Sequence, residues 1–113
     1  MPPEVAEQVY GRLPWMAGVG VDLITGTDAG LPGSPFDDSA GALELYEHLG
    51  FAPGRVVEMA TVCSAAALGL GEVTGRLAAG RDADVLVVGG DPRSGLGALV
   101  DVRLVLARGA VVD

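Results

Sequence analysis

The sequence predicts an α/β fold in which helices cover a strand on both sides, followed by a small β segment. Three observations lead to this prediction. Apolar residues fall on both faces of the stretch GVGVDLITG, residues 18–26, which is typical of a strand in a parallel sheet. Helical patterns precede and follow that stretch. A continuous apolar run at residues 85–88 indicates a strand in the C-terminal part.

The first predicted helix covers residues 3–17. Pro3 suits a first helical turn, and the carboxylates of Glu4 and Glu7 favour the positive N-terminal end of a helix. Proline lacks a backbone N–H and disrupts a helix interior, so we expect Pro14 to end or kink this helix.

A second helix is predicted over residues 39–49. Asp37, Asp38 and Ser39 are suitable N-terminal caps, and Gly50 is a typical residue to close the helix.

A third helix begins near Pro53 and continues to Leu70. Its small apolar residues form a narrow seam that permits close packing: Val56, Ala60, Cys63 and Ala67. Cys63 is the single cysteine, which excludes a disulfide framework and favours a buried small side chain over a reactive thiol.

The character of the sequence changes after residue 70. Gly75 and Gly80 indicate turns before the strand at residues 85–88, and the last twelve residues predict a strand, a tight turn at Gly109 and a short final strand. We therefore divide the chain into residues 1–70 and 71–113, without a flexible linker between them.

Composition excludes several classes of protein. A chain of 113 residues forms one domain at most, and half of its residues are hydrophobic, so it is expected to be globular. Its net charge of −8 argues against a nucleic-acid partner. No apolar run approaches the roughly 20 residues that span a bilayer. We expect a cytoplasmic protein without a membrane association.

Asp28 is the candidate site residue. An Asp after Gly-Thr in a loop is typical of a turn or a helix cap, but this one follows the C-terminal end of an apolar strand, where barrel enzymes carry catalytic groups. A carboxylate there could bind a divalent metal or take a proton from metal-bound water. The only histidine, His48, lies near a predicted helix end and is expected to interact with that end or with solvent.

Other catalytic patterns are absent from the sequence. The stretch GVGVDL lacks the third glycine of a dinucleotide fingerprint, and no phosphate-binding Gly-Lys-Ser/Thr loop is present. No serine has the Gly-x-Ser-x-Gly context of a hydrolase nucleophile.

Two stretches carry a resemblance to a known family: GVGVDLITGTDAG and ATVCSAAALGLGEVTGRLAAGRDADVLVVGGDP. From about residue 12 to 113 the chain resembles the C-terminal part of the amidohydrolase superfamily, close to its imidazolonepropionase-like and prolidase-like members. The resemblance implies the C-terminal part of a (β/α)8 barrel in residues 1–70 and strands of a small, composite β-sandwich in residues 71–113.

The resemblance also implies an activity. Members are metal-dependent hydrolases, and we expect the complete enzyme to hydrolyse non-peptide carbon–nitrogen bonds of a small amide or cyclic amide with a metal-activated water. Asp28 corresponds to the aspartate at the end of the eighth barrel strand, which ligates metal and handles the proton of the attacking water. Zinc is the expected ion. Asp84 corresponds to a structural residue at a strand start.

The sequence departs from the family in its other ligands. The His-x-His of the first strand, the bridging lysine or glutamate of the fourth and the histidines of the fifth and sixth have no counterpart. One of eight barrel strands is present, so we expect a C-terminal fragment that binds zinc weakly, hydrolyses nothing alone, and pairs with an N-terminal half or forms a homo-oligomer. The alternative is a non-catalytic scaffold or interaction module that pairs with another chain through open strand edges.

Overall fold

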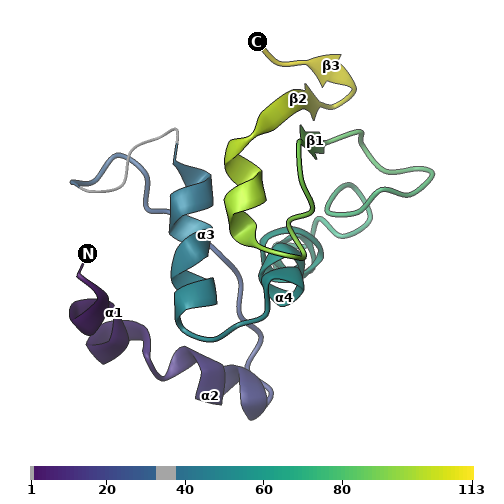
Figure 1. The fold of residues 1–113 in the computed structure, drawn as a ribbon. Coiled ribbons are helices and arrows are strands. Elements are labelled where there is room, and N and C mark those ends of the chain that lie inside the picture. Colours follow the sequence, from purple (N-terminus) through teal and green to yellow (C-terminus); the bar gives the residue numbers. More distant parts are fainter. Residues whose placement is uncertain (1, 33–37) are drawn as a thin grey trace.

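A computed structural model of the chain describes residues 2–32 and 38–113 (Figure 1). Helices and loops precede a small sheet at the C-terminus. In chain order the elements are helices α1 (Pro3–Tyr10), α2 (Leu13–Gly18), α3 (Ser39–His48) and α4 (Pro53–Glu58), π-helix η1 (Met59–Cys63), helix α5 (Ser64–Ala67), strand β1 (Val85–Val88), 3-10 helix η2 (Leu96–Val100) and strands β2 (Val102–Ala107) and β3 (Ala110–Val111). No helix of the described residues is long and apolar enough to cross a membrane.

The predicted first helix is two helices, so the predicted position of its end was wrong. α1 ends at Tyr10, and α2 begins at Leu13 with Pro14 in its first turn. Within one continuous helix, the ring of Pro14 would collide with the carbonyl of Tyr10, four residues earlier. The chain avoids this collision by stopping before the proline and starting again around it.

The predicted strand at residues 18–26 does not form in the described part of the chain, and this prediction was wrong there. Exposure alternates as in a strand only at residues 23–26, where Leu23 and Thr25 are partly buried and Ile24 and Gly26 are exposed, whereas residues 18–22 are all exposed. No described segment pairs with this stretch, and a strand is defined by the ladder that a neighbour completes.

The second predicted helix is confirmed as α3. The Asp38 side chain accepts a hydrogen bond of 2.9 Å from the Gly41 N–H, so Asp38 is the N-cap, whereas Asp37 lies outside the described residues. Gly50 follows the helix with a left-handed φ of +101°. His48 occupies the last turn and is exposed, as predicted.

The third predicted helix is confirmed from Pro53 to Ala67, but it contains a π turn that the periodicity does not reveal. Val56 of the predicted seam is fully buried, Ala60 and Cys63 are half-buried, and Ala67 is exposed. Since a π turn rotates the residues that follow it relative to an α-helix, Ala65 is buried instead.

The buried core joins the helices to the C-terminal part. It consists of Phe51, Val56, Met59 and Leu96, with Leu23 among the partly buried side chains packed against it. η2 lies beside α3 (Figure 1), where the Leu96 N–H donates a hydrogen bond of 3.4 Å to the Glu47 carboxylate. The two parts of the chain therefore share one core.

The strands form a three-stranded antiparallel sheet in the order β1-β2-β3, which confirms the predicted strand at residues 85–88 and the final hairpin. Leu86 pairs with Val105, and Leu106 pairs with Val111. Arg108 and Gly109, with φ of +51° and +82°, form the tight turn. The chain is thus a mixture of helix and strand, while the barrel and the sandwich of the expected complete enzyme stay predictions.

Candidate functional site

Asp28 lies in the loop that follows the unpaired stretch at residues 19–26. Its side chain is exposed and its backbone has a left-handed φ of +53°, a conformation that aspartate tolerates better than most residues. The Ala29 N–H donates a hydrogen bond of 3.2 Å to the Thr27 hydroxyl, and the Leu31 N–H donates one of 3.4 Å to the Asp28 carbonyl. The loop thus has a defined turn that leaves the carboxylate accessible.

Asp28 belongs to no complete metal-binding cluster among the described residues. Across residues 2–32 and 38–113, no group of three or more His, Cys, Asp or Glu side chains could hold a metal ion. Zinc in proteins usually takes three or four protein ligands, so the donors described here do not make a complete zinc site. The roles of Asp28 as metal ligand and proton acceptor therefore stay predictions.

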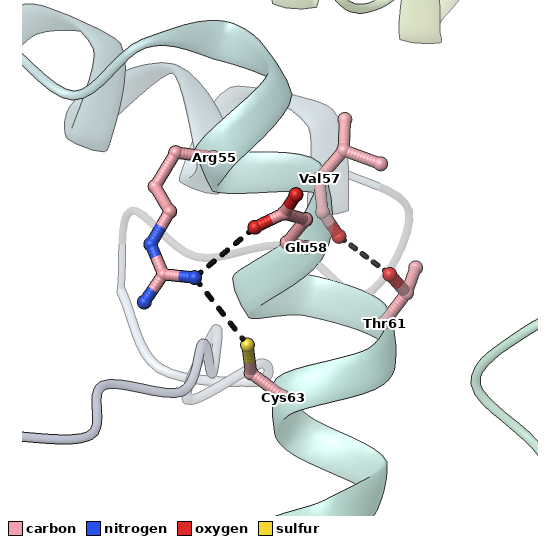
Figure 2. A network of polar contacts seen from close by, with 5 residues as sticks. All are labelled: Arg55, Val57, Glu58, Thr61 and Cys63. Atoms are coloured by element: carbon pink, nitrogen blue, oxygen red, sulfur yellow. Dashed lines mark hydrogen bonds and ion pairs between the residues drawn. The ribbon is translucent and has the colours of Figure 1, made fainter.

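Cys63 takes part in a polar network on the surface of α4 and η1 (Figure 2). Arg55 Nη1 donates to Glu58 Oε2 at 3.1 Å and to Cys63 Sγ at 3.6 Å. The hydrogen bond to Glu58, followed by the nearby Cys63, raises the pKa of Arg55. This contact could not be predicted from the sequence, because Arg55 and Cys63 are eight residues apart and Cys63 ends the π turn. Exposed ion pairs of this kind contribute little stability, and the network has no evident catalytic role.

Asp84 immediately precedes β1, and its side chain connects the start of that strand to the loop of Thr74 and to the turn between β2 and β3. One carboxylate oxygen accepts a hydrogen bond of 2.6 Å from the Thr74 hydroxyl, and the other accepts one of 2.9 Å from the Arg108 N–H. These two hydrogen bonds, the one from Thr74 first, lower the pKa of Asp84. Both oxygens bind the protein itself, which agrees with the structural role expected for this residue.

An open groove of about 600 Å³ lies between η1, α5 and β1, away from Asp28. Its walls are mainly apolar and include Thr61, Ala65, Leu68, Leu77, Leu86 and Leu99. Residues 2–32 contribute nothing to its lining, so the groove and the loop of Asp28 are separate features. The groove was not predicted, although Leu68, Leu70 and Leu77, close together in a glycine-rich stretch, indicate an apolar surface.

Comparisons with known proteins agree with the resemblance in the sequence. The family model described as "Amidohydrolase family" matches residues 7–112. The crystal structure of a "putative prolidase" from Bifidobacterium longum is 35% identical, with a TM-score of 0.80, over 90% of this chain and 25% of that one. A crystal structure of an amidohydrolase is 27% identical, with a TM-score of 0.76, over 88% of this chain and 24% of that one.

A third structure supports the fold alone. The crystal structure of a Xaa-Pro dipeptidase with bound methionine in the active site is 22% identical, with a TM-score of 0.80, over 98% of this chain and 26% of that one. No protein of curated function matches the sequence. The chain spans about a quarter of the length of the solved structures that it matches.

Proposed function

This chain belongs to the amidohydrolase family, and we propose that it is the C-terminal part of a metal-dependent hydrolase that cleaves carbon–nitrogen bonds other than peptide bonds. The observation that carries the proposal is the family match over residues 7–112, which includes Asp28 and its loop. The similarity to structures about four times as long supports a complete enzyme made of this chain and a larger N-terminal part.

In this proposal Asp28 has two roles. It supplies one carboxylate oxygen to a divalent ion, with zinc as the proposed ion, and it accepts a proton during hydrolysis of a small amide or cyclic amide. The exposure of Asp28 and its position in a turn after the strand-like stretch support both roles. The remaining ligands would come from the larger part, so the isolated chain should bind zinc weakly and hydrolyse nothing.

A peptide substrate is the second candidate. The 35% identity to the "putative prolidase" of Bifidobacterium longum favours a dipeptide that ends in proline as the substrate. The bond cleaved would then be a peptide bond. The two candidates differ in the substrate class and share the role of Asp28. Parallel assays with a proline dipeptide and a cyclic amide distinguish them.

The first experiment measures the zinc content of the purified, size-fractionated chain by elemental analysis, beside Asp28→Ala. We expect well below one zinc per chain in both proteins, since a single carboxylate is a weak zinc site. One tightly held zinc per chain that Asp28→Ala removes would contradict the proposed dependence on a larger part.

The second experiment tests Asp28 in a complete enzyme. In a chimera, this chain replaces the quarter of the Bifidobacterium longum protein that it matches. The chimera should hydrolyse one of the two substrates, and Asp28→Ala should lower kcat/KM by about 10²–10⁴-fold, the usual contribution of a positioned acid or base.

Asp22→Ala is the control for the chimera, because Asp22 is an exposed carboxylate six residues before Asp28. It should leave kcat/KM close to that of the parent chimera. Equal activity of Asp28→Ala and Asp22→Ala would show that Asp28 has no part in the reaction.

The alternative proposal is a non-catalytic module. The unpaired stretch at residues 19–26 favours it, because an unpaired strand edge is a template for a strand of another chain. An open reading frame directly upstream that encodes His-x-His and further barrel strands would favour the enzyme. A soluble, folded chimera without activity on either substrate would favour the module.

A further inference from the structure

We draw no further inference here: the strongest candidate, the apolar groove between η1, α5 and β1, is an open face of the molecule, and nothing in the structure shows what covers it.

Discussion

Residues 19–26 and the hairpin of β2 and β3 both have the sequence pattern of strands, but only the hairpin forms a ladder. The hairpin finds its partner locally, since a turn of two residues, Arg108 and Gly109, returns the chain alongside itself. Residues 19–26 lie between α2 and α3, and a strand between helices usually pairs with strands that are distant in the sequence. A strand pattern thus indicates which side chains can share a face, while the ladder depends on a second segment.

The two regions are also held differently. Strand β2 of the hairpin is joined on its other side to β1 by backbone hydrogen bonds along four paired positions, including Leu86 with Val105. Residues 19–21 donate backbone hydrogen bonds to the end of α2, and residues 22–26 are held by side chains such as Leu23, which packs against the buried core. Packing without a ladder restrains one face of a segment and leaves its backbone open to solvent or to another strand.

Hydrogen exchange should show the largest difference between the two regions. The amides that are hydrogen-bonded between β1 and β2 should exchange about a thousandfold more slowly than those of residues 22–26, because such amides open with much of the global stability of about 5 kcal/mol or more. The measurement is amide exchange followed by NMR at two protein concentrations. Equal protection of residues 22–26 would remove the contrast, and protection that rises with concentration would indicate pairing between copies.

Gly75→Ala tests the close packing of residue 75, in the C-terminal part, against Ala65 of α5. A Cβ at Gly75, where φ is +96°, would lie 2.6 Å from the Cβ of Ala65. Overpacking costs about 1–3 kcal/mol and a left-handed alanine about 1–2 kcal/mol, so the free energy of unfolding should fall by their sum. Urea unfolding measures it.

Gly80→Ala is the matched control for Gly75→Ala. Gly80 has a similar φ of +89°, but a Cβ there meets no atom within 4 Å, so only the backbone cost applies. An equal decrease in the free energy of unfolding in both variants would show that the close approach of Gly75 to Ala65 does not affect stability.

Leu23→Ala and Ile24→Ala separate the two faces of the unpaired stretch. Leu23 packs against the core and Ile24 is 40% exposed, although the residues are adjacent and similar in size. Because Leu23 is only partly buried, we expect its truncation to cost about 1–2 kcal/mol and that of Ile24 less than about 0.5 kcal/mol. Urea unfolding of both variants gives the difference, and a reversed order would mean that the opposite face is inward.

The smallest effect is expected from pH, at Asp84. Its pKa is lower in the folded protein than the usual 3.8, because Thr74 and the Arg108 N–H stabilise the carboxylate. A lowered pKa adds stability above the unfolded-state value, and this stability is lost as the pH falls through the folded-state value. The urea midpoint should therefore decrease between about pH 5 and pH 3 less steeply in Asp84→Asn than in the parent chain.

Asp82→Asn is the control for the pH experiment, since Asp82 is an exposed carboxylate two residues away whose side chain makes no described hydrogen bond to Thr74 or Arg108. Asp82→Asn leaves both hydrogen bonds of Asp84 in place, so its pH slope should exceed that of Asp84→Asn. Indistinguishable slopes in the two variants would mean that the hydrogen bonds of Asp84 are not maintained in solution.

The elements that could be predicted from the sequence depend on local contacts. α3 follows from its Asp38 cap and the glycine after it, and the final hairpin follows from alternating apolar residues around a turn with Gly109. In each case the residues that decide the structure lie within a few positions of one another. The gap between α1 and α2 is an intermediate case, since Pro14 predicts a break in the helix without indicating whether the break lies before or after the proline.

The π turn could not be predicted, and it moved the buried position from the seam at Ala67 to Ala65. Met59, at the start of the π turn, and Ala65, just after it, are both buried, and a run of small residues such as ATVCSAAA carries no period clear enough to locate an inserted residue. For the candidate site, the sequence singled out Asp28 but could not supply neighbours for it, since ligands of a metal site converge from segments distant in the chain.

By itself, the sequence determined the family, the helices with local caps, the C-terminal hairpin and Asp28 as the candidate residue. Only the tertiary structure decided that residues 19–26 form no ladder with the described part of the chain and that η2 packs beside α3. It also decided that Asp84 joins a loop to the hairpin turn. The physical reason is the range of the interactions. Caps, turns and periodicity act over a few residues, whereas pairing and packing depend on which distant segments meet.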